Sequence, residues 1–455
     1  MNNFNICVLG YNSNYKKFLS HIKDKKTKYQ LKLIDKTKNI NSFSYSILKD
    51  KLIKHSVKIL ALCDKNFISL ISNDIDFFIK KRIKIVQASN NYEVDNHGFI
   101  IEKPFKDYSF EELFLRKTLN LDLIKNSSLF KNKKIAITGG AGSIGSGLVK
   151  KLINFDVKKI YVIDNNEYNI FKLRNSIDKV EHTSKIEYYL TNIDNANLLN
   201  LNFKKIKPNI VFHAAALKHV VFLEKNVSQG IISNVLGTKN TILAAAKNNT
   251  QYFVHISTDK AADPKNVLGY TKLLSEYVCH NFKKSNMNIG IVRFGNVFNS
   301  FGSVAETIRN QIFQVKKIKL SHPSVERYFM SITEATNLII STLQIISKNQ
   351  NKKKCRTFIC DMGTPIKIKD LAIKILYLSG RIPEKYISKS YYGLKNIEKL
   401  IEKLISKKEK IIKIINNRIF EISCKFKKID EKRLIQIIAQ DFNNTELKRN
   451  LIKLI

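Results

Sequence analysis

TGGAGSIGS, residues 138–146, joins the apolar run KKIAIT to the helix-like pattern SGLVKKLI. With Gly147 it holds five of the chain's 16 glycines, at positions 139, 140, 142, 145 and 147. A strand, a glycine-rich turn and a helix in this order are typical of dinucleotide-binding folds. Gly139 permits the tight turn, Gly142 lets backbone N–H groups approach a pyrophosphate, and Gly145 lets helix and strand pack closely. The segment therefore predicts a dinucleotide-binding α/β domain.

A carboxylate follows this turn at the expected distance. Asp164 ends the next apolar run, KIYVID, 19 residues after Gly145. A carboxylate there accepts hydrogen bonds from a ribose diol and repels a 2′-phosphate. The position favours NAD over NADP as the coenzyme.

Short apolar runs alternate with helix-length polar segments on both sides of the turn, which predicts an α/β, Rossmann-like, doubly wound parallel sheet. We expect this catalytic domain at residues 133–320 and a connector at 116–132. Residues 1–115 predict a smaller α/β domain whose only early turn glycine, Gly10, lacks the further glycines of a phosphate loop. A structural or regulatory role is expected for it. Residues 321–455 predict a mixed, helical, substrate-binding region that ends in Lys-rich amphipathic helices.

Composition excludes several classes of protein. The 455 residues carry 79 Lys+Arg against 38 Asp+Glu, a net charge of +41, but the lysines are spread along the whole chain. We therefore expect a generally basic surface that attracts anions and no nucleic-acid partner. The six cysteines form no ligand-like spacing, so no metal site is expected. Neither a signal peptide nor a membrane span is predicted, which favours the cytoplasm.

The turn has G-x-x-G-x-x-G spacing, and with Lys272 it resembles the extended short-chain dehydrogenase/reductases. More narrowly, the chain is similar to the CapD-type polysaccharide biosynthesis family of nucleotide-sugar 4,6-dehydratases and epimerases. The segments that carry this resemblance are HAAALKHV (213–220), NVLGTKN (234–240), ISTDKAADPKNVLGYTK (256–272), VRFGNVFNSFGSV (292–304), ERYFMSITEA (326–335) and DMGTPIKIKDLA (361–372).

The resemblance implies an NAD-dependent UDP-N-acetylglucosamine 4,6-dehydratase that supplies a 4-keto-6-deoxy nucleotide sugar for polysaccharide, capsule, O-antigen or glycan synthesis. The implied cycle oxidises carbon 4, removes water across carbons 5 and 6, and returns the hydride to carbon 6. A homo-oligomer is also implied. Two alternatives stay open: a UDP-N-acetylhexosamine 4-epimerase, and a catalytically silent nucleotide-sugar-binding protein.

The strand YFVHIS delivers three candidate catalytic residues to the carboxyl edge of the sheet, where ligands bind in open α/β sheets. The resemblance implies that Thr258 hydrogen-bonds the 4-hydroxyl, that Asp259 is the acid for the leaving hydroxyl, and that Lys260 is the base at carbon 5. Lys272 would bind the nicotinamide ribose.

One position departs from the family pattern. Leu268 stands four residues before Lys272, where many relatives have the tyrosine of Y-x-x-x-K. Some members of the same family have methionine there. The acceptor of the 4-hydroxyl proton is therefore left open, and Tyr270, about 200° further round the helix, is a weak candidate.

The resemblance also implies binding residues. Lys395 replaces an arginine of the family, which keeps the charge but loses the bidentate fork on a diphosphate. His219 is equally expected as a structural histidine. The coenzyme-contacting positions are Ser143, Ile144, Asn192, Ile193, Ala214 and Ala215, in addition to Gly139, Gly142, Gly145, Asp164 and Lys272. The substrate-contacting positions are Lys218, His219, Asn296, Arg327 and Lys395.

Overall fold

The structure is a computed structural model of the 455-residue chain. It describes residues 4–9, 29–35, 45–63, 75–94, 100–106, 128–177, 185–283, 285–314, 317–348, 355–378, 386–388, 391–394, 396–415, 418–423, 426–429, 433, 435–437 and 443–455. Gly10, Lys395 and residues 116–127 of the expected connector lie outside these ranges.

The chain divides into two compact units, each built from segments that are distant in sequence. The first comprises Met1–Lys117, Ile308–Leu320 and Lys369–Tyr391. The second comprises Thr118–Thr307, Ser321–Ile368 and Tyr392–Ile455. The domain boundaries expected at residues 115, 132 and 320 stay predictions.

The first unit contains a five-stranded sheet in the order β2-β1-β3-β4-β5. β1 to β4 are parallel and β5 runs antiparallel to β4. Ile6, Val8 and Leu60 are completely buried in this sheet, as expected of short apolar strands in a covered parallel sheet. The elements are β1 (Phe4–Leu9), β2 (Tyr29–Asp35), α2 (Tyr45–Lys54), β3 (Ile59–Leu62), α4 (Ile75–Lys81), β4 (Lys84–Val94) and β5 (Ile100–Lys106).

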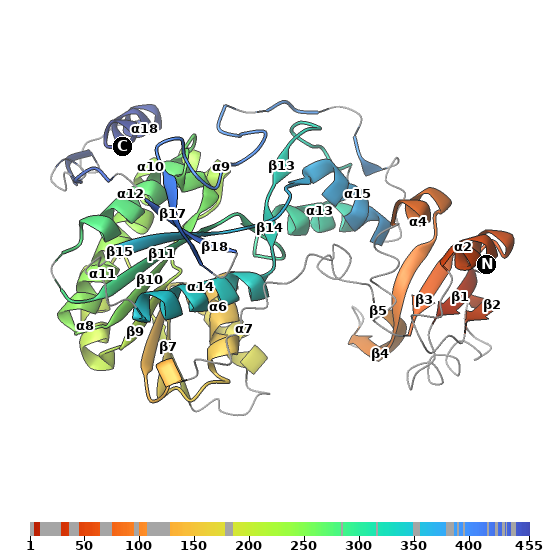
Figure 1. Ribbon diagram of the computed structural model, residues 1–455, viewed down its shortest axis with the longest axis horizontal. Helices are drawn as coiled ribbons and strands as arrows, with labels where there is room; N and C mark the ends of the chain where they lie inside the picture. The colour runs from red at the N-terminus through yellow and green to blue at the C-terminus, as the bar shows by residue number, and fades with distance from the viewer. Residues whose placement is uncertain are drawn as a thin grey trace. The chain divides into compact units, whose positions relative to one another are not determined.

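The second unit contains a nine-stranded sheet in the order β17-β18-β15-β11-β10-β9-β6-β7-β8 (Figure 1). Within this sheet, the neighbouring strands β15, β11, β10, β9, β6, β7 and β8 all run parallel. The chain starts at β6, moves outward through β7 and β8, then returns to β9 on the other side of β6, so the order of strands reverses between β6 and β9. Ligands bind at such a switch point. The strands are β6 (Lys134–Thr138), β7 (Lys159–Asp164), β8 (Ile186–Leu190), β9 (Ile210–His213), β10 (Tyr252–Thr258), β11 (Asn288–Phe294), β15 (Cys355–Cys360), β17 (Lys410–Ile415) and β18 (Ile419–Ser423).

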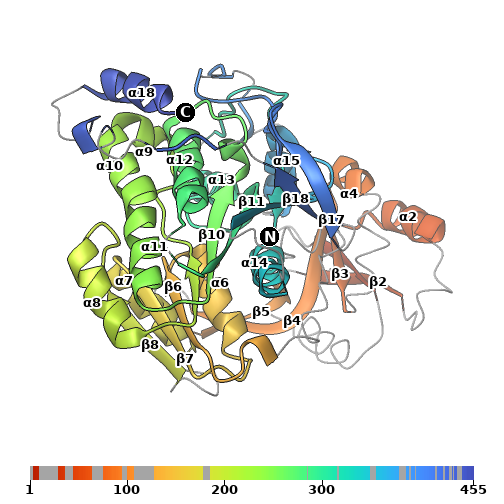
Figure 2. The same ribbon diagram turned by 60° about the vertical axis from the view of Figure 1, so that its left-hand side comes forward.

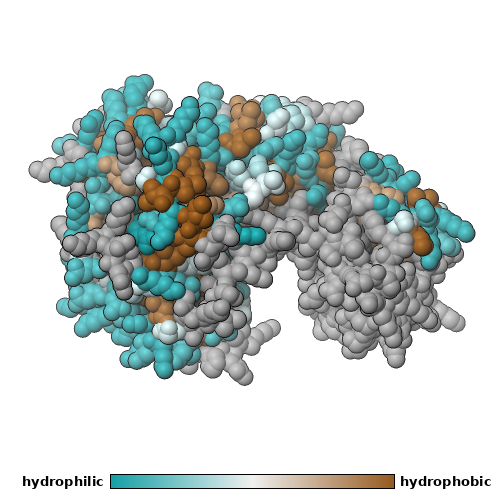
Figure 3. Space-filling model, in the orientation of Figure 1, coloured by the Kyte–Doolittle hydropathy of each residue, from teal (hydrophilic) through white to brown (hydrophobic). Residues whose placement is uncertain are grey.

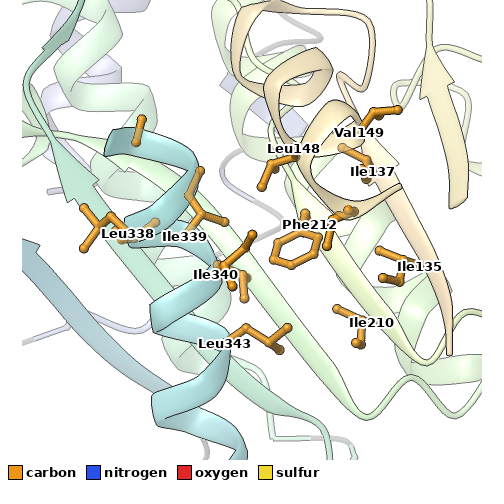
Figure 4. Packing of buried hydrophobic residues seen from close by; sticks show 14 of the residues in the cluster. Ile135, Ile137, Leu148, Val149, Ile210, Phe212, Leu338, Ile339, Ile340 and Leu343 are labelled. Carbon is orange, nitrogen blue, oxygen red and sulfur yellow. The ribbon is translucent and has the colours of Figure 1, made fainter. Parts of the chain in front are cut away.

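Helices cover both faces of this sheet, as Figure 2 shows. On one face, Leu148 of α6 and Leu343 of α14 pack against Ile137 and Phe212 of the strands (Figure 4). On the other face, Phe203 of α8 and the apolar side of α11 and α12 form a separate cluster. The other elements of this unit are α6 (Ser143–Leu152), α7 (Glu167–Ile177), α8 (Ala196–Ile206), α9 (Val220–Lys225), α10 (Val227–Ile231), the π-helical turn η4 (Ile232–Leu236), α11 (Gly237–Lys247), the 3-10 turn η5 (Asp259–Ala261), α12 (Val267–Asn281), β12 (Asn296–Val297), β13 (Glu326–Arg327), β14 (Phe329–Met330), α14 (Ile332–Ser347), β16 (Ile366–Lys367) and α18 (Asn444–Lys453). Most residues of α13 (Val304–Phe313) and α15 (Ile368–Leu378) belong to the first unit. Within the described ranges, no helix has both the length and the apolar character that a membrane crossing requires.

The sequence predicts Lys-rich amphipathic helices toward the end of the chain, and the structure has strands in part of this region. Lys410–Ile415 and Ile419–Ser423 are the antiparallel strands β17 and β18, and β18 pairs with β15. β-branched isoleucines favour strands, and the open edge beside β15 offers hydrogen bonds to them. Hydrophobic side chains gather over β17 in Figure 3. Ile411, Ile412 and Ile414 of this strand are exposed, Ile414 to 63%. The helix expected at the end of the chain is present as α18.

Candidate functional site

A cavity of about 670 Å³ opens within the second unit at the carboxyl ends of β6, β7, β9 and β10. The glycine-rich turn and Asp164 line one part of it. Thr258, Lys260 and Lys272 line another part. The structure therefore brings the predicted coenzyme turn and most of the predicted catalytic residues to one cavity.

The glycine-rich turn needs its glycines for different reasons. Gly139 has φ +64°, and a Cβ there would lie 2.6 Å from the backbone nitrogen of Ala215. A Cβ on Gly145 would lie 2.1 Å from the carbonyl oxygen of Gly139, which is closer than any real contact. Around Gly142, by contrast, a Cβ would meet only the Gly139 oxygen, at 3.2 Å. Gly139 and Gly145 are thus required by the fold, whereas Gly142 leaves room beside the cavity.

Asp164 is tied to the turn by its carboxylate. Its Oδ2 accepts a hydrogen bond from the Ala141 N–H at 2.9 Å and its Oδ1 accepts one from the Asn166 N–H at 3.0 Å. Each carboxylate oxygen accepts more than one hydrogen bond, so both keep capacity for a ribose diol. The residue is 8% exposed and lines the cavity. This arrangement fits the adenosine side of a dinucleotide.

The other predicted coenzyme positions also lie around the cavity. Ile193 is buried, and Asn192 is exposed with its Oδ1 accepting the Asp194 N–H at 3.1 Å. The cavity is lined by Ser143, Ile144, Asn192, Ile193, Ala214 and Ala215.

Three oxygens surround the Lys260 ammonium. It donates to Asp259 Oδ1 at 3.0 Å and to Asn296 Oδ1 at 3.3 Å. Glu402 Oε1 lies 3.8 Å from the same nitrogen. Asp259 also accepts a hydrogen bond from the Thr258 hydroxyl at 2.9 Å, while its Oδ2 is buried and has no hydrogen-bond partner in the part of the chain that the structure describes. Asp259 does not line the cavity itself and reaches it through Thr258 and Lys260, which do.

Lys272 is a buried residue of α12 on the cavity wall, and its side chain reaches β10. Its ammonium donates to the Ile256 carbonyl oxygen at 2.6 Å and lies 3.4 Å from His255 Nε2. Burial lowers the pKa of Lys272 to about 8, against the opposing effect of Glu276. Burial and the charge of Lys272 also lower the pKa of His213 to about 3 and that of His255 well below its usual range. The two imidazoles are therefore neutral, and Lys272 carries the charge at this place.

Leu268 contributes an apolar side chain to the cavity wall, four residues before Lys272. Tyr270 does not line the cavity. Its side chain packs with the cluster formed by α9, α10 and α12. The structure therefore gives no support to Tyr270 as the group that replaces the family tyrosine.

The predicted substrate residues divide into two groups. Lys218, His219 and Asn296 line the cavity, and burial lowers the pKa of both Lys218 and His219. Arg327 does not line the cavity. Its guanidinium donates instead to the carbonyl oxygens of Lys399 at 3.0 Å and Leu400 at 3.1 Å.

Sequence reasoning missed two groups of residues around this site. Asn234, in the π-helical turn, accepts the Leu217 N–H at 2.8 Å and donates to the Leu217 carbonyl and the Thr271 hydroxyl at 3.0 Å each. It thereby holds the loop that carries Lys218. Asn234 belongs to the motif NVLGTKN, but only the structure shows what its side chain contacts. Single-turn π-bulges occur frequently at functional sites.

The second missed group is a buried ion network under the strand ends. The fully buried Arg293 donates to Glu276 Oε1 at 2.7 Å and Oε2 at 2.6 Å, and to Glu409 Oε2 at 2.9 Å. Ser257 donates to Glu276 Oε1 at 2.5 Å. No local pattern joins positions so far apart in sequence, so the sequence carries no signal for this network.

The model of the family described as "Polysaccharide biosynthesis protein" matches residues 135–424, which include every residue of this cavity. The capsular polysaccharide biosynthesis protein CapD of Staphylococcus aureus is 31% identical over 446 residues, 95% of this chain and 71% of CapD. The chain belongs to the polysaccharide biosynthesis protein family.

Two further comparisons describe this family member. Pen from Bacillus thuringiensis, a solved structure, has a TM-score of 0.58 at 30% identity over 66% of this chain and 90% of Pen. The UDP-glucose 4-epimerase of Rickettsia canadensis is 33% identical over 220 residues, 47% of this chain and 63% of the epimerase. The Rossmann-like fold and the family predicted from the sequence are confirmed.

Proposed function

We propose that this member of the polysaccharide biosynthesis family is an NAD-dependent UDP-N-acetylglucosamine 4,6-dehydratase. The observation that carries the proposal is the position of Lys260. Its ammonium lies between Asp259 and Asn296 on the wall of the cavity that the glycine-rich turn also lines. A charged pair on a surface would be exposed, whereas here the Asp259 side chain is 0% and the Lys260 side chain 16% exposed.

The coenzyme would be held by Gly142, Asp164 and Lys272. The room beside Gly142 fits a pyrophosphate, the Asp164 carboxylate fits a ribose diol, and Lys272 lies at the other part of the cavity. When bound, NAD supplies the site that takes up and returns a hydride. The Asp164 carboxylate disfavours a 2′-phosphate, which supports NAD over NADP.

Within the proposed reaction, each residue at the end of β10 has one task. At the start of this step Lys260 is the neutral amine and Asp259 the neutral acid. Lys260 takes the proton from carbon 5 of the 4-ketone, and the hydroxyl of carbon 6 leaves as water after it receives the proton of Asp259. Asp259 reaches the sugar by way of the Thr258 hydroxyl, which it contacts at 2.9 Å, and the step leaves an ammonium beside a carboxylate. The bond between carbon 6 and oxygen breaks as the bond between carbons 5 and 6 gains its second electron pair.

Incubation of the full chain with NAD and UDP-N-acetylglucosamine, followed by mass spectrometry, tests this proposal. We expect a product that has lost one water, and we expect Lys260→Ala and Asp259→Asn to lower kcat by about 10²-fold or more. A Lys172→Ala variant, altered on the outer helix α7, is the control and should retain full turnover. Full turnover in both active-site variants would contradict the assigned roles.

A 4-epimerase is the second candidate, because the Rickettsia relative carries that name. Epimerisation needs no elimination, so the substrate mass would stay unchanged while a new stereoisomer forms. Bound NAD with no product from any UDP-sugar would instead favour a silent binding protein, which Leu268 in the cavity wall would explain.

We further propose that the protein is a cytoplasmic homo-oligomer. Light scattering of the purified chain would test the oligomeric state.

A further inference from the structure

We infer that Glu402 is a positioning residue for Lys260, delivered to it by a strap formed by residues 396–402. This inference deepens the proposed function and rests on it for its kinetic consequences. Glu402 is 4% exposed and does not line the cavity. Its Oε1 lies 3.8 Å from Lys260 Nζ, so it acts on the cavity only through that amine.

The strap is fixed to the body of the second unit from two sides. Arg327, a residue predicted to touch the substrate, donates to the carbonyl oxygens of Lys399 and Leu400 at 3.0 and 3.1 Å. On the other side, Asn266, which caps α12, donates to the Ile397 carbonyl oxygen at 3.0 Å. Both contacts hold the backbone of the strap, which sets where Glu402 stands.

A second lysine completes the arrangement. The Lys399 ammonium contacts Asp263 Oδ2 at 3.0 Å and Glu402 Oε2 at 3.9 Å. Glu402 is thus shared between one lysine that faces the cavity and one that anchors the strap to the loop after η5. A buried carboxylate needs such charge partners, and each partner also restricts where the carboxylate can point.

The position of Glu402 has a chemical consequence for a base at Lys260. When Lys260 takes the proton of carbon 5 it becomes an ammonium, and a carboxylate within 4 Å stabilises that charge as it forms. Since Glu402 stays outside the cavity, it makes no contact with the bound nucleotide sugar. Its loss should therefore lower kcat and leave KM nearly unchanged.

The test compares wild type, Glu402→Gln and Glu402→Asp, with Glu187→Gln as the matched control. Glu187 also pairs with a lysine, Lys159 at 3.1 Å, but its side chain is 41% exposed on β8 at the edge of the sheet. We expect Glu402→Gln to lower kcat by about tenfold or more with KM within about twofold of wild type. Glu402→Asp keeps the charge and should recover part of the loss, and the control should match wild type.

A second measurement needs no turnover. A trace of acetic anhydride acylates only neutral amines, and peptide mass spectrometry reports how fast each lysine reacts. Glu402 restrains the Lys260 amine from one side, so Glu402→Gln should leave this amine more accessible and let it react about fivefold faster, with Lys159, which does not contact Glu402, as an internal comparison. Because labelling is read on the folded fraction, a poorly folding Glu402→Gln is replaced by Glu402→Asp, whose shorter side chain should let Lys260 react faster than in wild type but more slowly than expected for Glu402→Gln.

The outcomes distinguish a failure of the role of Glu402 from a failure of the proposed dehydratase function. A kcat within twofold of wild type in Glu402→Gln, or an unchanged acylation rate of Lys260, would overturn the role of Glu402. If wild type itself gives no dehydrated product, the proposed function fails, and the acylation rates still decide whether Glu402 holds Lys260.

Discussion

Lys272 is a buried cation whose pKa burial lowers despite the nearby Glu276, and this has a measurable effect on stability. Its pKa is lowered by burial to about 8 from 10.5, so the folded chain loses this proton while the unfolded chain keeps it. Stability rises with pH wherever the unfolded state binds more protons. The contribution of Lys272 to the free energy of unfolding therefore grows between pH 8 and 10.5.

We predict that the difference in the free energy of unfolding between wild type and Lys272→Met rises by up to about 3 kcal/mol across this window. Urea denaturation of both proteins without coenzyme, at a series of pH values, measures it. The subtraction removes the opposite effect of Tyr161 and Cys279, whose pKa values burial raises. A difference that stays flat with pH would show that Lys272 keeps its proton in the folded chain.

At the same scale, sequence reasoning could reach some site residues and not others. The position of Thr258, Lys260 and Lys272 on the cavity wall was predictable, because each belongs to a local motif next to a recognisable strand or helix. The role of Arg327 was predicted from a motif as well, yet its guanidinium lies against the carbonyls of Lys399 and Leu400. Glu402 gave no signal, because only the tertiary path of the strap brings it near Lys260.

At the scale of the element, the glycines of the glycine-rich turn serve two purposes: Gly145 is needed by the fold, and Gly142 leaves room beside the cavity. Gly145 leaves no room for a Cβ, whereas Gly142, with φ −71°, has an ordinary backbone conformation and one neighbouring atom. We predict that Gly145→Ala destabilises the chain by about 2–3 kcal/mol, because the methyl meets backbone atoms that cannot yield.

Gly142→Ala should stay within about 1 kcal/mol of wild type in stability but bind NAD about tenfold or more weakly, since the methyl occupies the path of the pyrophosphate. Thermal melting and calorimetric titration with NAD measure the two effects on the same samples. Equal melting temperatures for the two variants, or unchanged NAD affinity in Gly142→Ala, would contradict the distinction.

Most elements of the catalytic sheet were predictable, because five-residue apolar strands between amphipathic helices leave a clear pattern. The strands β6, β7 and β10 and the helix α6 lie where the runs KKIAIT, KIYVID and YFVHIS and the pattern SGLVKKLI predict them. The hairpin of β17 and β18 did not follow from the sequence alone. In β17, KIIKII, lysine recurs every third residue and not every second, so the pattern does not indicate a strand, and the pairing of β18 with β15 and of β17 with β18 determines the structure.

At the scale of the whole molecule, the net charge of +41 should act on the substrate before it binds. A basic surface attracts a doubly charged nucleotide sugar, and salt screens this attraction. We predict that KM for UDP-N-acetylglucosamine rises by about threefold between about 0.05 and 0.3 M NaCl, while kcat stays constant. Binding of uncharged uridine is the control and should not respond to salt. A KM independent of salt would show that the charge has no role in substrate capture.

The ion network of Arg293 also bears on how this chain can change over generations. Replacing Arg293 alone would leave two acidic side chains facing each other without water, while replacing Glu276 or Glu409 alone would leave a guanidinium short of its partner. Any single substitution at these three positions therefore lowers stability, and only the simultaneous replacement of all three by well-packed apolar residues avoids this loss. Positions 276, 293 and 409 therefore constrain one another's substitution, although they lie on a helix, a strand and a distant loop.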